Sequence, residues 1–252
     1  MWKNNSIDEY SAQLGKGFMA FVLALIVCVL IFNGNTPNVP GIVSDVIPAV
    51  VHIDSPEICQ GSGCLISEDG ILFTARHVTK GLCNDYKVTL NDGRKFNVKH
   101  IIEDRENDLA FMQLDLPAGV TVPYAELDQS RKTRVGESVI IIGSSLGIDN
   151  FNTVSSGIVS YIGREINPVH DNPFGWRAMI QSTSPAYPGN SGGPVFNMAG
   201  KVIGVLVAGM DATLNYSVSA NCFSDDLDSI RMALSLSRFA EVVEEENYNG
   251  QF

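Results

Sequence analysis

The most constraining feature of this 252-residue sequence is a long succession of short apolar segments separated by turn-forming residues. From residue 47 to residue 222 the segments follow one another at intervals of roughly 8–12 residues, a spacing typical of β-barrels and β-sandwiches rather than βαβ units. One connection, Asn91-Asp92-Gly93, is a strong hairpin signal. The sequence therefore predicts an all-β fold, either a barrel or a sandwich.

The segments form two series, and the stretch from Pro117 to Arg134 reads as the connection between them. The first series comprises residues 49–54, 63–67, 71–75, 86–90, 95–103 and 109–115. The second comprises residues 137–143, 153–163, 178–182, 193–197, 201–209 and 215–220. After Cys222 apolar residues recur at helical spacing instead. We therefore predict a C-terminal helix whose apolar positions are Leu227, Ile230, Leu234, Phe239 and Val243.

An uncharged apolar run occupies residues 17–32, with the sequence GFMAFVLALIVCVLIF. As a helix its sixteen residues would span about 24 Å, a little less than a ~30 Å hydrocarbon core. An uncleaved anchor, a cleaved signal peptide, a buried core helix and a lipid-modified Cys28 are the alternatives. A linker rich in Asn, Gly and Pro follows without an Ala-x-Ala cleavage site, which favours the anchor. We expect an N-terminal tail at 1–16, a transmembrane signal anchor at 17–33 and a linker at 34–46.

Charge indicates the orientation of this anchor and restricts the partners. Lys3 and Lys16 precede the run and no Lys or Arg follows before Arg76. The positive-inside rule therefore predicts a cytoplasmic N-terminus and an extracytoplasmic bulk, periplasmic or extracellular. The net charge of −11 argues against a nucleic-acid partner, whose phosphates require Lys and Arg. An oxidising compartment would permit disulfides among the cysteines after the run, which are Cys59, Cys64, Cys83 and Cys222.

The sequence Gly189-Asn190-Ser191-Gly192-Gly193-Pro194 combines a serine with glycines, directly before an apolar segment. A serine hydroxyl is a weak nucleophile and needs a neighbouring base. It also needs N–H donors for the oxyanion that forms when it attacks a carbonyl. Glycines let the backbone turn so that such donors converge, and the amides of Gly189 and Ser191 are our candidates. The alternative is a glycine-rich turn without chemistry.

Two further residues complete a candidate catalytic set. His77 ends an apolar segment in Thr-Ala-Arg-His-Val, and its imidazole could take the serine proton and return it to a leaving amine. Asp108 opens another segment and could orient that imidazole, although an ordinary turn aspartate is the alternative. The order His77, Asp108, Ser191 is that of the two-barrel serine proteases. We interpret His52, His100 and His170 as packing or surface histidines.

These blocks resemble the trypsin-like serine peptidases, and within them the HtrA/Deg type. The resemblance covers roughly residues 47–222 and is carried by residues 61–78, 104–115, 135–147, 153–165 and 180–207. It implies two packed six-stranded β-barrels, no cofactor or metal, and hydrolysis of protein or peptide substrates through an acyl-enzyme. It assigns the catalytic roles to His77, Asp108 and Ser191, and the oxyanion hole to Gly189 and Ser191.

The two series of apolar segments, together with the extent of the resemblance, give the expected boundaries. We expect the first barrel at 47–120, an inter-barrel connection at 121–134, the second barrel at 135–222, and a C-terminal helix with an acidic tail at 223–252. The thirty residues after Cys222 are too few for the PDZ domain that HtrA proteases usually carry. Asn190 stands where digestive relatives carry an aspartate that pairs with a new N-terminus, which argues against activation by that route. Cys64 and Cys83 bracket His77 and are a candidate disulfide by analogy.

Position relative to Ser191 suggests an uncharged substrate pocket, which would suit small or medium apolar side chains. Its candidate residues are Pro185, Ala186, Val207, Gly209 and Ser219. Two other functions remain open. One is a catalytically latent protease fold that serves as a binding or scaffolding module, and the other is an esterase or acyltransferase with the same triad. The sequence lacks a Gly-x-Ser-x-Gly elbow in a strand-turn-helix context, which argues against an α/β-hydrolase. The oligomeric state is not indicated.

Overall fold

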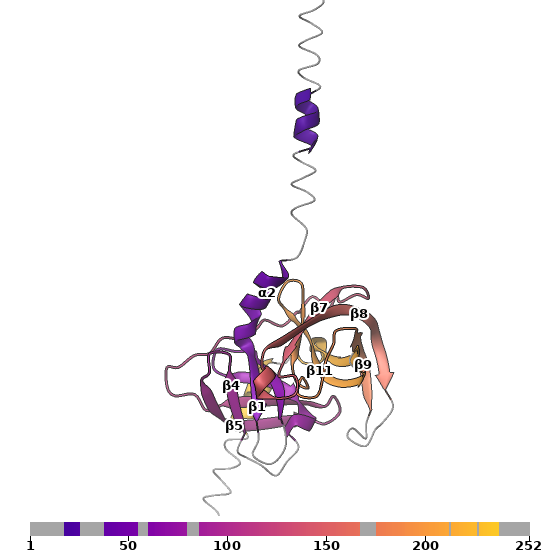
Figure 1. Ribbon diagram of the computed structural model, residues 1–252. Coiled ribbons are helices and arrows are strands. Elements are labelled where there is room, and N and C mark those ends of the chain that lie inside the picture. Colours follow the sequence, from indigo (N-terminus) through magenta and orange to yellow (C-terminus); the bar gives the residue numbers. More distant parts are fainter. Residues whose placement is uncertain are drawn as a thin grey trace, which may run out of the picture. The chain divides into compact units, whose positions relative to one another are not determined.

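The computed structural model describes residues 18–25, 38–54, 60–79, 86–166, 175–211, 213–225 and 227–236. The chain divides into two compact units, residues 1–38 and residues 39–252, and all of the described strands belong to the second (Figure 1). In the first unit residues 18–25 are helical and exposed. The rest of the predicted anchor at 17–33 lies outside the described residues. Within the described ranges no helix is both long enough and apolar enough to cross a membrane.

The first six described strands close into an antiparallel barrel in the order β1-β2-β3-β6-β5-β4. The strands are β1 (Val50–Asp54), β2 (Gln60–Leu65), β3 (Ile71–Ala75), β4 (Lys87–Leu90), β5 (Lys95–Asp104) and β6 (Leu109–Leu114). The predicted hairpin at Asn91-Asp92-Gly93 joins β4 to β5, and Gly93 supplies the positive φ that the turn requires. Short 3-10 helices precede β1 (η1, Ile47–Ala49) and follow β3 (η2, Arg76–Thr79).

The next six strands close a second antiparallel barrel in the order β10-β11-β12-β9-β8-β7. They are β7 (Ser138–Gly143), β8 (Thr153–Ile166), β9 (Trp176–Ser182), β10 (Pro194–Asn197), β11 (Val202–Asp211) and β12 (Leu214–Ser219). Two 3-10 helices, η3 (Ile148–Asn150) and η4 (Ala220–Cys222), and a helix over residues 227–236 complete this part. Every predicted apolar segment overlaps one strand, so the all-β prediction with two six-stranded barrels and a C-terminal helix is confirmed.

Strand β7 is apolar on consecutive residues because both of its faces are buried. On β7, Val139 and Ile141 belong to a cluster inside the second barrel. Ile140 and Ile142 point the other way and join the large cluster that includes the interior of the first barrel. Strands buried on both faces read as continuous apolar runs rather than alternating ones. β7 thus contributes side chains both to the interior of the second barrel and to the cluster that it shares with the first.

The segments that flank the barrels cross over to the opposite barrel. Helix α2 (Val39–Val46) precedes the first barrel, but Ile42 and Val46 lie against Gly200 in the turn between β10 and β11. Phe223 follows the second barrel, and its ring packs on Phe73 and Phe111 of the first, with centroid distances of 5.7 and 5.4 Å. Ile230 and Leu234 of the C-terminal helix join the same large cluster.

Two expectations need correction. Residues 39–46 fall in the predicted linker, yet they form α2, because Pro40 suits a first helical turn and apolar residues of this helix pack on the core. The candidate Cys64–Cys83 disulfide is not formed, because Cys64 is a free thiol. Cys64 is fully buried in β2, and this burial raises the pKa of its thiol. Cys83 lies outside the described residues.

Candidate active site

The first barrel holds His77 against Asp108. The chain leaves β3 in the short helix η2, while Asp108 lies immediately before β6, the neighbour of β3 in the barrel. The Nδ1 atom of His77 lies 2.8 Å from Oδ2 of Asp108, and the backbone N–H of His77 donates to Oδ1 at 3.1 Å. The Asp108 carbonyl accepts the N–H of Arg76 at 2.8 Å. One aspartate therefore fixes both the ring and the backbone of this histidine.

Asp108 is only 3% exposed and has a positive φ of 56°. Asp is one of the few non-glycine residues that enter this left-handed region. The two competing aspartates have other roles. Asp104 accepts N–H groups from Glu106 and Asn107 at 3.0 and 3.1 Å, which shapes the turn that leads to Asp108. Asp115 forms an ion pair with Lys99 at the surface. Of the three aspartates, the structure brings only Asp108 to His77.

The second barrel presents Ser191 on a tight loop that depends on two glycines. Gly189 has a φ of +96°, and a Cβ atom there would lie 2.2 Å from the carbonyl oxygen of Ser144. Gly192 has a φ of +82°, and a Cβ atom there would lie 2.2 Å from the carbonyl oxygen of Ser62. Side chains would be excluded at both positions by backbone conformation and by contact. These glycines let the loop fold closely between the two barrels.

Hydrogen bonds orient the peptide groups of this loop. The carbonyl of Pro188 accepts the N–H of Leu146 at 2.7 Å, and the carbonyl of Asn190 accepts the N–H of Gly193 at 2.9 Å. In a trans peptide the N–H points away from the carbonyl. The N–H groups of Gly189 and Ser191 therefore face away from these acceptors. Within the described part of the chain, neither N–H donates to another group.

The serine loop lies directly against the strand that leads to His77. A Cβ atom on Gly192 would come within 2.7 Å of the Ala75 backbone nitrogen, two residues before the histidine. Among the described residues, no hydrogen bond joins the Ser191 hydroxyl to the ring of His77. Such bonds are often long in unliganded enzymes and tighten when substrate binds. The structure thus pairs His77 with Asp108 and brings the backbone beside Ser191 to the same strand end.

A cavity of about 450 Å³ opens beside Ser191. Three of the five predicted pocket residues line it, namely Ala186, Val207 and Gly209. Pro185 and Ser219 do not line it, and the Ser219 hydroxyl instead accepts the N–H of Asn221 at the start of η4. The remaining lining residues are Tyr187, Pro188, Leu206, Ala208, Met210, Asp211 and Asn215.

Two polar members of this pocket escaped the sequence analysis. Asn215 is buried, and its amide nitrogen donates to the carbonyl of Ser184 at 2.6 Å. Asp211 is exposed, so the pocket carries one carboxylate that the sequence reasoning did not expect. The Thr213 backbone N–H and hydroxyl donate to it and hold the pKa of the Asp211 carboxyl below its usual value. The pairing of β11 with β12 brings Asn215 opposite Gly209, and no local sequence signal reports it. Asp211 follows the predicted pocket residue Gly209 by two positions on β11, so its place in the sequence could have located it.

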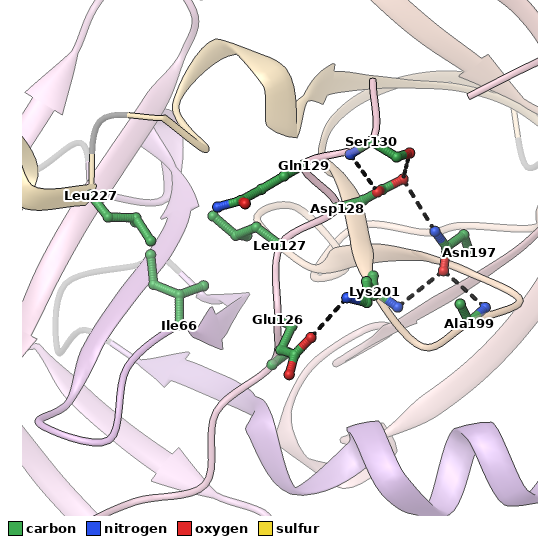
Figure 2. Close-up of a pocket in the computed structure, with 11 residues that line it drawn as sticks. Ile66, Glu126, Leu127, Asp128, Gln129, Ser130, Asn197, Ala199, Lys201 and Leu227 are labelled. Atoms are coloured by element: carbon green, nitrogen blue, oxygen red, sulfur yellow. Dashed lines mark hydrogen bonds and ion pairs between the residues drawn. The ribbon is translucent and has the colours of Figure 1, made fainter. Parts of the chain in front are cut away.

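A larger cavity, of about 620 Å³, lies in a different place (Figure 2). It is bounded by the inter-barrel connection and by the turn between β10 and β11. Figure 2 shows that its charged groups are paired with neighbours: Lys201 with Glu126 at 2.9 Å, and Asp128 with Asn197 at 3.3 Å. Among the residues that the structure describes, no histidine or cysteine lines it. Size alone therefore does not identify the site, and the chemistry favours the smaller cavity at Ser191.

The described residues contain no group of three or more His, Cys, Asp or Glu side chains that could hold a metal ion.

A comparison with family models matches residues 61–205 to the trypsin-like peptidase domain, which is more than half of the chain. The chain belongs to the trypsin-like peptidase family.

Curated relatives of this trypsin-like peptidase include proteins of the HtrA/Deg type. It is 36% identical over 183 residues to a probable periplasmic serine endoprotease DegP-like of Halomonas elongata, covering 71% of this chain and 36% of that protein. It is 39% identical over 149 residues to the putative serine protease HhoA of Synechocystis, covering 59% and 36% of the two chains. The chain thus spans about a third of the length of these relatives.

Solved structures agree with this family. The HtrA-type protease AlgW with a tripeptide superposes with a TM-score of 0.67 and 30% identity, covering 77% of this chain and 64% of that one. The resemblance to the HtrA/Deg type, drawn above from sequence blocks, is therefore confirmed.

Proposed function

We propose that this trypsin-like peptidase is a serine endopeptidase in which Ser191 is the nucleophile, His77 the general base and Asp108 the residue that orients the base. The observation that carries the proposal is the 2.8 Å contact between His77 Nδ1 and a buried Asp108 carboxylate, on the strand end against which the serine loop packs. The names of the relatives, which describe serine endoproteases, support the same reaction.

The proposed mechanism follows from this geometry. With Nδ1 directed at Asp108, the other ring nitrogen of His77, Nε2, takes the proton from the Ser191 hydroxyl as its oxygen attacks the scissile carbonyl. The backbone N–H groups of Gly189 and Ser191, which have no acceptor among the described residues, stabilise the oxyanion. His77 then protonates the leaving amine. A water molecule, activated by the same nitrogen, hydrolyses the acyl-enzyme and restores the serine.

The first experiment measures covalent labelling of the full-length chain by a fluorophosphonate, which reacts with activated serines. We expect labelling of the parent protein and none in Ser191→Ala or His77→Ala. Ser217→Ala is the matched control, because Ser217 is a fully buried serine outside the pocket and should label normally. A folded parent protein that does not label would overturn the proposal and favour a latent binding module.

We propose further that the pocket beside Ser191 accepts small or medium apolar side chains. Ala186, Leu206 and Val207 supply apolar surface, whereas the carboxylate of Asp211 is exposed and already accepts two hydrogen bonds from Thr213. Profiling with a peptide library should therefore show cleavage after residues such as Ala or Val. Cleavage after Lys or Arg would mean that Asp211 governs the pocket and would contradict this proposal.

We also retain the proposal that residues 17–33 anchor the chain in a membrane with the peptidase domain outside the cytoplasm. Support comes from the uncharged apolar run, from the lysines that precede it, and from relatives described as periplasmic. Extraction at alkaline pH tests it. The full-length chain should stay with the membrane pellet, whereas a variant with Asp in place of Leu23 and Val27 should be released. Release of the full-length chain would overturn the anchor.

A further inference from the structure

Ser62 belongs to β2 of the first barrel, yet the partners of its hydroxyl lie in the second barrel. The Ser62 Oγ donates to the carbonyl of Gly189 at 2.7 Å and accepts the N–H of Ser144 at 2.8 Å. The side chain is fully buried. Ser144 directly follows β7, and Gly189 lies in the serine loop. One hydroxyl thus joins three segments that are far apart in the sequence.

The backbone of Ser62 reinforces this connection. Its N–H donates to the carbonyl of Ser191 at 2.8 Å, and its own carbonyl accepts the hydroxyl of Thr74 at 2.7 Å. Ser62 therefore holds the carbonyls on both sides of Asn190, those of Gly189 and Ser191. Thr74 lies on β3, three residues before His77, so the same residue is tied to the strand that carries the base.

The serine loop needs such a restraint because of Gly189. A glycine at this position allows the backbone to rotate with little steric resistance. The Gly189 carbonyl is one of the groups that would have to turn if the loop rotated, and Ser62 holds it in place. Without the hydroxyl, the Gly189 carbonyl and the Ser144 N–H would be left without their partner. Unpaired buried polar groups are costly, so the loop would tend to rearrange.

We propose that Ser62 is a positioning residue that fixes the peptide groups of the serine loop so that the Gly189 and Ser191 N–H groups face the reacting carbonyl. The inference rests on the proposed serine endopeptidase function. Ser62 itself touches no reacting atom in this scheme, and it acts through Gly189. The proposal therefore concerns transition-state stabilisation rather than ground-state binding of the peptide.

The test compares the full-length parent with Ser62→Ala and with Ser217→Ala. Both substitutions remove a hydroxyl from a fully buried serine. The Ser62 hydroxyl has hydrogen-bond partners, whereas the Ser217 hydroxyl has none among the described residues. Loss of one oxyanion donor typically lowers kcat by about 10²–10³-fold. Because Ser62 acts indirectly, we expect kcat to fall by about 10–100-fold in Ser62→Ala with KM nearly unchanged. We expect Ser217→Ala to match the parent.

A transition-state analogue distinguishes positioning from a general loss of structure. The inhibition constant of a peptide boronate should rise in Ser62→Ala by about the factor by which kcat/KM falls, because both depend on the oxyanion donors. Binding of an uncleaved peptide to Ser191→Ala should not change when Ser62→Ala is added. Unaltered kcat in a folded Ser62→Ala protein, or a loss that appears only in KM, would overturn the proposal.

Hydrogen exchange supplies a measurement that does not depend on activity. In the parent protein the Ser144 N–H should exchange as slowly as strand amides. In Ser62→Ala the hydrogen-bonded amides of the serine loop, those of Asn190, Gly192 and Gly193, should exchange faster. Fast exchange of the Ser144 N–H in the parent would refute the role of Ser62 even if the alanine variant does not fold. Failure of the parent to react with fluorophosphonate, with slow Ser144 exchange, would instead refute the catalytic proposal and leave the restraint on the loop intact.

Discussion

The two barrels contribute to the site in different ways. In the proposed site, the first barrel supplies the side chains of His77 and Asp108, and the second supplies Ser191 together with backbone N–H groups. In the first barrel, the Asp108 carboxylate contacts both the backbone and the ring of His77 and so fixes this half of the proposed site. The second half depends on glycines whose missing Cβ atoms leave room for neighbouring carbonyls. Residue identity therefore specifies the half that holds His77 and Asp108, whereas the space around the main chain specifies the half that holds Ser191.

Removing the carboxylate of the first barrel should have the largest effect. Asp108→Asn keeps the shape of the side chain but lets the histidine adopt the wrong tautomer. Triads that lose this carboxylate typically lose about 10⁴-fold in kcat. Steady-state cleavage of a peptide substrate measures the loss. Asp104→Asn is the matched control, and it should retain most of the activity because Asp104 only shapes the adjacent turn. Equal losses in both variants would contradict the assigned role.

A substitution in the backbone-dependent half should have the next largest effect. Gly189→Ala would place a methyl group 2.2 Å from the Ser144 carbonyl oxygen and should displace an oxyanion donor. We expect kcat to fall by about 10²–10³-fold. Gly136→Ala controls for backbone strain alone, because Gly136 also has a positive φ, +90°, but has no neighbour within 4 Å of a Cβ atom. A Gly136→Ala protein as inactive as Gly189→Ala would show that the contact is not responsible.

The smallest effect concerns a histidine of the first barrel outside the site. His52 is buried beside Phe151, and burial lowers the pKa of its imidazole, with smaller effects from Asp54, which raises it, and Lys95. Below about pH 6.5 the unfolded chain takes up a proton that the folded chain resists, so stability should fall as the pH drops through this value. Urea unfolding at pH 7.5 and pH 5.5 measures the difference.

His52→Gln should reduce this dependence on pH. The variant lacks the titrating imidazole, so its loss of stability between the two pH values should be smaller than that of the parent. An unchanged difference would assign the acid sensitivity to other groups. The result would separate a structural histidine of the first barrel from His77, whose ring is directed at a carboxylate.

Much of the fold could be predicted because the strands carry local signals. The apolar segments and the Asn-Asp-Gly turn located all the described strands, including those buried on both faces such as β7. The pairing of His77 with Asp108 rather than Asp104 was also accessible, since only Asp108 opens an apolar segment. These predictions needed residue types and short-range order alone.

The features that escaped prediction depend on the register between distant strands. Asn215 reaches the pocket because β12 pairs with β11 opposite Gly209, and no local pattern reports this pairing. The free state of Cys64, which is fully buried in β2, was not indicated by its position in the sequence. The contacts of Ser62 likewise arise only when both barrels are in place. Sequence reasoning identified the serine loop, but the orientation of its peptide groups depends on hydrogen bonds to residues far away in the sequence.

The crossed packing of the flanking segments has a consequence for the order in which the protein is completed. Phe223 packs on Phe73 and Phe111 of the first barrel, and Ile230 and Leu234 join the large cluster that includes its interior. All three are synthesised after the strands of both barrels. While the chain is still emerging from the ribosome, the first barrel must leave part of its apolar surface uncovered. The half of the proposed site that carries His77 and Asp108 is therefore synthesised first, but its barrel is fully covered only after residues 223–234 have emerged.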